Sequence, residues 1–466
     1  MLKSLVYKNF RLQAQGIRRL ASVASNAGLE LVDSSEASTT IKLDDKMLVT
    51  YHNVFLRDSC TMADKSIHKD SKQKLFKTSE IVPKSVPAST PRVIEDPRTG
   101  ASMLEIEWDE GDGKTHKSTY SKQFLTQYSN IEARRIGKFF ENDVIQWDRS
   151  KLVTAKNKGK IDFDYDSYVK DDLVLFDVLK KINTYGIVFI NNIPKQEEKT
   201  NKWFIEDIAT RIGYIRETFY GKLFDVKSVD NAKNIAYTSH SLPLHMDLLY
   251  YQSPPGLQLL HSIKNSVEGG ESIFADSFFA AKYVAQTEPQ AYFALTNVPI
   301  SYHYENDEQY YYYARPLVVE DEASTDFATG QHTIKECNYS PSFQAPFEFG
   351  ITKPFSPQDK DDLVSSHSIS SNVNNAKEIG DSYLFKDFLR GLAMFEEFVH
   401  DPVNQYAIKI PENTCVIFDN RRILHSRNEF VLKEGEERFL KGCYLNKDTY
   451  MSKLRVLTKK FGHLFS

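Results

Sequence analysis

The sequence predicts a mainly β protein with a barrel-like fold and supporting helices. Its 466 residues include 30 Phe and 25 Tyr, and aromatic side chains favour strands. Short strand-like runs recur towards the C-terminus, at 187–190, 257–263, 272–274, 298–302, 310–313, 407–410, 414–418 and 440–445. Helical patterns occur at 173–185, ended by Gly186, and at 203–212, 277–287 and 383–399. Many strands with a few helices indicate a β barrel supported by helices.

A small β domain is predicted to precede this fold, over residues 38–131. Strand propensity is high at 41–43, 47–51 and 104–108, and prolines between these runs indicate loops. The charged stretch 132–172 is predicted to be a linker that contains a helix. The main domain is then expected to occupy residues 173–466.

The first 29 residues differ in composition from the rest of the chain. They contain five basic residues and no acidic one, and their apolar residues are spaced to form one face of a helix. A cationic amphipathic helix is typical of a mitochondrial targeting segment, so residues 1–29 predict location in the mitochondrial matrix. The alternative is a disordered basic tail. Acidic residues are frequent after this segment, which favours targeting.

The bulk composition limits the classes of function. A formal net charge of -4 gives no reason to expect a nucleic-acid partner. The four cysteines lie far apart and form no CxxC, which suits a reducing compartment. No apolar run approaches the length of a membrane span. The nucleotide-binding motifs GxGxxG and GxxxxGK[ST] and the hydrolase motif GxSxG are absent from the sequence.

Three residues suggest a metal site. His245 and Asp247 are two apart, so on a strand their side chains would project from one face. His425 follows an apolar run and a turn, and can supply a third ligand. Two imidazoles and one carboxylate on one face of an octahedral ion leave positions open for a co-substrate and O2. An isolated HxD is weak evidence, because many such pairs are ordinary surface or core residues.

Arg438, thirteen residues after His425, strengthens this interpretation. An oxo-acid that chelates a metal leaves its far carboxylate to be anchored, and the planar guanidinium matches a carboxylate. The alternative is a surface arginine at the end of the charged run 433–438. Arg438 also opens an apolar strand, so it can lie at the mouth of a barrel.

Several blocks of the sequence carry a family resemblance. They are residues 216–221 (RETFYG), 236–238 (AYT), 245–247 (HMD), 254–261 (PPGLQLLH), 269–272 (GGES), 418–420 (FDN) and 424–425 (LH). Together with Arg438 they resemble the γ-butyrobetaine dioxygenase and trimethyllysine dioxygenase family of carnitine biosynthesis, over most of the chain. The resemblance implies a double-stranded β-helix (jelly-roll) fold. It also implies iron(II), 2-oxoglutarate as co-substrate, ascorbate as reductant, and succinate and CO2 as co-products.

The resemblance also assigns residues of the binding sites. His245, Asp247 and His425 would hold iron, while Arg438, Ser272 and Leu260 would contact 2-oxoglutarate. The family holds a quaternary ammonium against aromatic faces, which attract a cation without a hydrogen bond. The residues that correspond to its substrate contacts are Tyr220, Phe224, Asn234, Tyr237 and Tyr444. The alternative for the aromatic ones is an ordinary core role, and Phe224 stands where γ-butyrobetaine enzymes carry Trp.

The predicted N-terminal domain departs from the family at its structural zinc site. Of the three cysteines after Leu-Arg-Asp only Cys60 remains, and Met62 and Lys65 stand at the other two positions. His116 corresponds to the family's histidine. Two ligands cannot form a closed four-ligand site, so no zinc is expected there.

The substrate region departs from the family as well. Arg421 stands where both characterised branches have Trp, and residues 338–344 replace a polar segment. The expected substrate is therefore γ-butyrobetaine or a similar quaternary amine, with trimethyllysine or an unrelated amine or acid as alternatives. A non-catalytic mitochondrial protein with a vestigial site is the alternative from another class. The family association favours a homodimer and a small-molecule substrate with O2.

Overall fold

The computed structural model describes residues 28–63, 65–140, 143–197, 201–227, 240–306, 308–321, 333–347 and 383–462. The chain divides into two compact units at the boundary between Phe139 and Phe140. Of the predicted targeting segment only Gly28 and Leu29 belong to the described residues. No helix among the described residues is long and apolar enough to cross a membrane.

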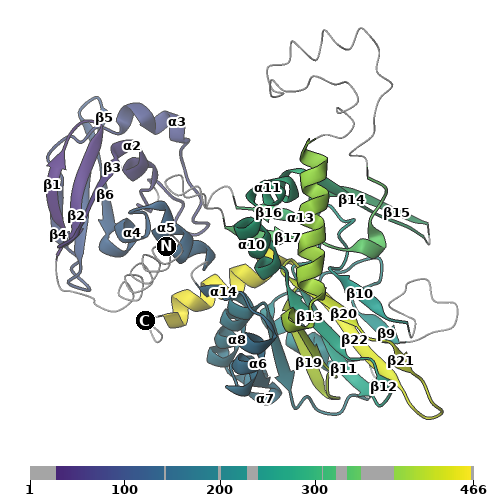
Figure 1. The fold of residues 1–466 in the computed structure, drawn as a ribbon. Helices are drawn as coiled ribbons and strands as arrows, with labels where there is room; N and C mark the ends of the chain where they lie inside the picture. Colours follow the sequence, from purple (N-terminus) through teal and green to yellow (C-terminus); the bar gives the residue numbers. More distant parts are fainter. Residues whose placement is uncertain are drawn as a thin grey trace, which may run out of the picture. The chain divides into compact units, whose positions relative to one another are not determined.

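The first unit contains two three-stranded antiparallel sheets and several short helices (Figure 1). The strands are β1 (Glu30–Ser34), β2 (Ser38–Asp44), β3 (Met47–His52), β4 (Arg92–Glu95), β5 (Ser102–Gly111) and β6 (Lys114–Ser121). The helices are α2 (Asn53–Asp58), α3 (Thr78–Ile81), the 3-10 helix η2 (Val82–Lys84), α4 (Lys122–Gln127) and α5 (Ile131–Phe139). The three strands predicted here are confirmed as parts of β2, β3 and β5. Their inward residues build a core around Trp108.

Two larger sheets form the centre of the second unit. A six-stranded sheet has the order β7-β8-β19-β11-β22-β9, and a four-stranded sheet has the order β10-β20-β13-β18. All neighbours in both sheets are antiparallel except β7 and β8. The strands are β7 (Asp162–Asp164), β8 (Ile187–Asn191), β9 (Phe224–Lys227), β10 (Leu242–His245), β11 (Leu257–Asn265), β13 (Ser272–Asp276), β18 (Gln405–Ile408), β19 (Thr414–Asp419), β20 (Ile423–Arg427) and β22 (Arg438–Leu445).

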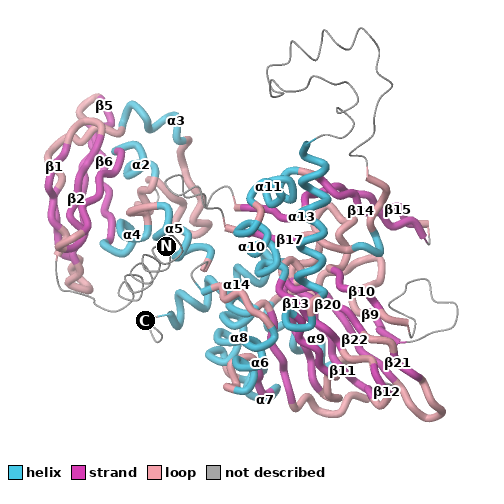
Figure 2. Tube along the Cα trace, viewed as in Figure 1, coloured by secondary structure: helices cyan, strands magenta, loops and turns pink. Residues whose placement is uncertain are grey.

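Smaller elements complete this unit. Three two-stranded sheets pair β12 (Glu268–Gly269) with β21 (Phe430–Val431), β14 (Pro299–Asn306) with β15 (Gln309–Pro316), and β16 (Val318–Glu320) with β17 (Ile334–Cys337). The helices are α6 (Arg149–Asn157), α7 (Tyr165–Lys170), α8 (Asp172–Tyr185), α9 (Phe204–Ile212), α10 (Ser277–Thr287), α11 (Pro289–Asn297), α13 (Tyr383–His400), α14 (Lys447–Phe461) and the 3-10 helices η6 (Pro341–Phe343) and η8 (Pro402–Asn404). Figure 2 shows α6, α7 and α8 gathered beside the strands. The fold is therefore a mixture of many strands with substantial helix.

The six-stranded sheet separates two hydrophobic clusters. Along β11, Leu257 and Leu259 belong to a cluster that includes apolar residues of α8, α9 and α14, whereas Leu260 belongs to a cluster shared with the four-stranded sheet. This alternation follows from the two-residue period of a strand. Because both faces are covered, β11 carries leucines on both of its faces.

Helix α8 shows why its prediction from sequence was correct. The side chain of Asp171 accepts a hydrogen bond from the backbone N–H of Leu173 at the N-terminus. Gly186 ends the helix with a φ of 75°, in the left-handed region that glycine adopts without strain. A Cβ on Gly186 would also lie 2.6 Å from Cδ1 of Ile423, which begins the strand that carries His425.

Part of the stretch predicted to be a linker lies instead in the core of the second unit. Trp147, Leu152 and Ile161 are fully buried in the cluster between the sheets. Strand β7 adds to the edge of the six-stranded sheet by pairing with β8. The many charged residues led to the linker prediction. They occupy exposed positions such as those of α6, whereas the apolar residues between them are buried.

His261 on β11 has no hydrogen-bonding partner among the residues that the structure describes. It is fully buried, faces the helices like Leu259, and both ring nitrogens lack a partner in this part of the chain. Burial lowers its pKa from 6.5 to about 4. Between these pH values the unfolded chain binds a proton that the folded chain does not, so stability should fall as pH falls from 6.5 towards 4, by up to about 3 kcal/mol.

We expect His261→Leu to reduce this loss of stability at acid pH. Urea unfolding at pH 7 and pH 5 should give a smaller difference in the variant than in the unchanged protein. His400→Leu, at an exposed position on α13, is the control and should keep the full difference. An unchanged pH dependence in His261→Leu would mean that other groups cause it.

Candidate metal centre

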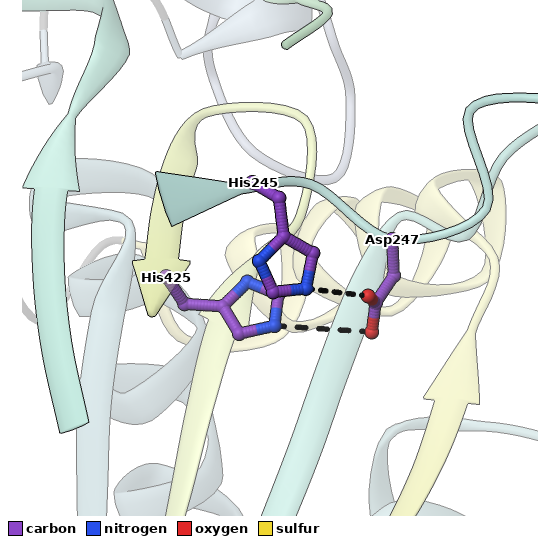
Figure 3. A group of neighbouring side chains, drawn as sticks. All are labelled: His245, Asp247 and His425. Atoms are coloured by element: carbon purple, nitrogen blue, oxygen red, sulfur yellow. Dashed lines mark ion pairs between the residues drawn. The ribbon is translucent and has the colours of Figure 1, made fainter. Parts of the chain in front are cut away.

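Two histidines lie opposite each other on neighbouring strands of the four-stranded sheet. His245 ends β10 and pairs in register with His425 on β20. Directly opposed residues of an antiparallel pair bring their side chains together, and the two ring centroids are 4.2 Å apart. In both rings the Nε2 atom faces the side chain of Asp247 (Figure 3).

Asp247 completes the cluster from the turn that follows β10. Its Oδ1 lies 3.2 Å from Nε2 of His245 and its Oδ2 lies 3.9 Å from Nε2 of His425 (Figure 3). The three residues offer ligand atoms that all lie within 4.8 Å of one another, and no other group of three His, Cys, Asp or Glu in the described ranges does so. We expected His245 and Asp247 to lie on one strand with their side chains on the same face. β10 ends at His245, so Asp247 lies in the turn and strand alternation does not position its carboxylate.

Asn420 and Tyr444 fix the position of Asp247. The Asn420 side chain accepts from the backbone N–H of Asp247 at 2.8 Å and donates to its carbonyl at 3.0 Å. It also donates to the carbonyl of Pro255 at 3.2 Å, so its amide is fully used. The hydroxyl of Tyr444 donates to Oδ2 of Asp247 at 2.7 Å. No such role of Asn420 was predicted from the sequence.

The protonation states suit a metal ligand set. Burial opposes ionisation of Asp247, but His245, His425 and the Tyr444 hydroxyl outweigh it and hold the pKa of this carboxyl well below its usual range. Burial, and then the neighbouring His245, lowers the pKa of His425 to about 3. Nδ1 of His245 lies 2.8 Å from the carbonyl of Pro243, which orients the ring so that Nε2 faces Asp247. Neutral imidazoles and an ionised carboxylate are the forms that bind a metal.

The donor set therefore fits iron(II). Two imidazole nitrogens and one carboxylate are the ligand set of non-haem iron oxygenases. His245, Asp247 and His425 all line one pocket.

Most of the other predicted site residues line the same pocket. These are Tyr220, Phe224, Leu260, Ser272, Arg438 and Tyr444. The ring of Phe224 stacks on that of Tyr444 at 4.8 Å. Asn234 and Tyr237, the remaining two, lie outside the described residues.

Arg438 is buried at the pocket wall, where β22 begins. Burial, and then the charge of Arg427, lowers its pKa to about 9, so it stays a cation at neutral pH. Gly270, with a φ of 71°, packs against it, and a Cβ there would lie 3.2 Å from Nε of Arg438. The surface alternative is thus wrong, because only 5% of this residue is exposed.

Several pocket residues were missed in the sequence, among them Arg427, Gln258 and Tyr250. Arg427 is two residues after His425 on β20, so strand alternation could have placed it on the same face. Gln258 is buried between Leu257 and Leu259 at the start of β11, where an amide among leucines is a detectable exception to the pattern. Tyr250 lines the pocket too, but in a chain with 25 Tyr nothing distinguished it.

Arg421 does not line the pocket. Its Nη2 lies 2.9 Å from Oε1 of Glu336 on β17, and it also donates to the side chain of Asn338. Phe343, from the substituted segment 338–344, does line the pocket. Arg421, which stands where the family has Trp, therefore forms a buried ion pair. The segment 338–344 contributes an aromatic ring to the cavity.

Cys60 and His116 meet in the first unit. Sγ of Cys60 lies 3.2 Å from Nε2 of His116, which is also 3.3 Å from the hydroxyl of Ser66. Although burial opposes ionisation, hydrogen bonds led by the one from His116 lower the pKa of this thiol to about 6. Side-chain hydrogen bonds thus connect the two residues that correspond to family zinc ligands.

Comparison with known proteins agrees with this geometry. Residues 149–444 match the taurine catabolism dioxygenase TauD, TfdA family. The chain belongs to this family. Its relatives include the probable oxidoreductase AIM17 of Saccharomyces cerevisiae, 33% identical over 89% of this chain and 86% of that protein. Dioxygenase str8 of Strobilurus tenacellus is 32% identical over 96% and 93% of the two chains. The γ-butyrobetaine dioxygenase of a Pseudomonas species is 25% identical over 97% and 99%.

Membership in the TauD, TfdA family makes the chain a 2-oxoglutarate-dependent dioxygenase with iron as its metal. The resemblance to the carnitine-pathway dioxygenases inferred from sequence is confirmed.

Proposed function

We propose that the protein hydroxylates an aliphatic carbon of a small, γ-butyrobetaine-like substrate, in carnitine biosynthesis. The observation that carries this proposal is one pocket that contains the His–Asp–His cluster, a buried arginine and several aromatic side chains. The cluster accounts for iron, the arginine accounts for the co-substrate, and the aromatic side chains account for a cationic substrate.

In this proposal His245, Asp247 and His425 hold iron(II). With 2-oxoglutarate and O2 bound, the metal supplies the chemistry that replaces a C–H hydrogen by a hydroxyl group and releases succinate and CO2. Arg438 anchors the far carboxylate of 2-oxoglutarate, with Ser272 and Leu260 beside it. The surrounding apolar walls exclude water, so that the reaction takes place on the bound substrate.

The aromatic residues Tyr220 and Phe224 support a quaternary ammonium substrate, since their faces attract a cation. Tyr444 contributes a ring as well, although its hydroxyl is used on Asp247. Asn234 and Tyr237 are proposed to complete this site. Trimethyllysine is the second candidate substrate. A different amine or acid is the third, since Phe343 and Phe224 alter the wall.

Substrate-uncoupled turnover tests the activity. Purified protein with iron(II), ascorbate, O2 and 2-oxoglutarate should release succinate, and Asp247→Ala should release only the background amount. A panel of γ-butyrobetaine, trimethyllysine and other amines and acids should then identify the compound that stimulates 2-oxoglutarate consumption and gains one oxygen atom by mass. Succinate release no greater than that of Asp247→Ala would contradict catalysis by this site.

Iron content distinguishes the enzyme from a vestigial protein. A vestigial site should retain no iron after purification with added iron(II), whereas the intact cluster predicts about one ion per chain. An iron-bound sensor would bind the metal without releasing succinate.

Further parts of the proposal concern architecture and location. The two facing sheets of the second unit support a double-stranded β-helix for the dioxygenase domain. The composition of residues 1–29 supports import into the mitochondrial matrix. The hydrogen-bonded pair of Cys60 and His116 supports a first domain that folds without zinc. A homodimer remains a prediction.

A further inference from the structure

Gln258 has a buried amide oxygen for which the described residues supply no partner. Only 3% of the residue is exposed, and its Oε1 accepts no hydrogen bond from the described part of the chain. The side chain lines the pocket from the inner face of β11. Burial of an amide without partners destabilises a protein, and so such a group in a pocket indicates a ligand.

The register places this amide beside the metal cluster. Gln258 lies opposite Phe418 on β19 and opposite Tyr444 on β22. The ring of Phe418 is 4.9 Å from that of His425, and the hydroxyl of Tyr444 contacts Asp247. Gln258 therefore lies between two side chains that each touch a proposed metal ligand.

The same register separates Gln258 from the anchor of the co-substrate. Arg438 and Tyr444 are six residues apart on β22, which is about 20 Å along a strand. Leu260 lies opposite Gly442, between these two levels. 2-Oxoglutarate would extend from the metal towards Arg438, and so it would extend away from Gln258.

We propose that Gln258 hydrogen-bonds the organic substrate, at the end of the pocket away from Arg438. This inference rests on the proposed function. Oε1 accepts, so the substrate must carry near the reacting carbon a hydroxyl or N–H group that donates to it; a carboxylate or carbonyl fits only if the amide is turned over so that its NH2 group donates instead. A quaternary ammonium has no N–H to donate, so in a γ-butyrobetaine-like substrate the carboxylate end would accept a hydrogen bond from Nε2 of the turned-over amide.

A pair of identical substitutions tests whether the amide has a structural role. Gln196 is also buried, but its amide donates to the carbonyls of Glu197 and Lys202 and accepts from the N–H of Phe204. Gln196→Met should lower the melting temperature of the full chain by about 2 °C or more. Gln258→Met, which removes an amide whose oxygen has no partner among the described residues, should melt at or above the temperature of the unchanged protein. A fall equal to that of Gln196→Met would overturn the proposal.

A kinetic test uses γ-butyrobetaine as the probe. Gln258→Met should raise the KM for γ-butyrobetaine at least tenfold, and by a larger factor than the KM for 2-oxoglutarate. Equal rises in both constants, or a rise for 2-oxoglutarate alone, would contradict contact with the substrate. An amide bound only by ordered water would leave both constants unchanged, which also contradicts it. Lack of succinate from the unchanged protein would instead contradict the proposed function. The comparison of melting temperatures would still test whether the Gln258 amide has a structural role.

Discussion

Replacing Arg438 with methionine is expected to raise the KM for 2-oxoglutarate by about 100-fold or more. A charge-assisted contact between a buried guanidinium and a carboxylate is worth about 3 kcal/mol, and every 1.4 kcal/mol corresponds to a factor of ten in affinity. Methionine keeps much of the volume but offers neither charge nor donors. Steady-state 2-oxoglutarate consumption at a series of co-substrate concentrations measures the effect.

Arg438→Lys provides a graded control for this prediction. Lysine keeps the charge but loses the planar fork, so its KM should lie between those of the unchanged protein and Arg438→Met. Equilibrium iron binding should change little in both variants, because Arg438 is not among the three clustered ligands. If the KM for 2-oxoglutarate stays within about threefold in Arg438→Met, the carboxylate is anchored elsewhere, and Arg427 becomes the residue to test.

Elements with strong local patterns were predictable from sequence. Strand β11 begins with three leucines among its first four residues, and α8 has its capping aspartate and its terminal glycine. Arg438 and the two histidines were predictable because family motifs mark them. Helix caps, strand patterns and short motifs consist of residues close together in the chain, so they can be recognised in a single sequence.

Features that depend on distant contacts were not predictable. Asn420 holds Asp247 across 173 positions of sequence, and no local pattern records that bond. Trp147 belongs to the core of the second unit, because its indole donates to the carbonyl of Tyr185 and its backbone N–H donates to Asp276. In each case a polar or charged surrounding sequence concealed a residue whose partners come from other elements.

The part of Asn420 in positioning Asp247 leads to the second prediction of large effect. Asn420→Asp preserves the shape of the side chain but replaces its donor with a carboxylate oxygen. That oxygen would face the carbonyls of Asp247 and Pro255, which now accept at 3.0 and 3.2 Å. Repulsion should displace the turn that holds Asp247, and we expect the affinity for iron(II) to fall by about 10- to 100-fold. Titration of the metal-free protein with iron(II) under anaerobic conditions measures this.

Two further variants separate positioning from general stability. Asn420→Ala removes the bonds without introducing repulsion, so excess iron(II) should restore much of its succinate release, as it cannot in Asp247→Ala. Asn404→Ala removes another buried amide, which donates to the carbonyl of Phe398 away from the cluster. That control should lose stability but keep its iron affinity. If Asn420→Asp instead binds iron as tightly as the unchanged protein, the Tyr444 hydroxyl and the chain turn alone suffice to place the carboxylate, and Asn420 serves only the fold.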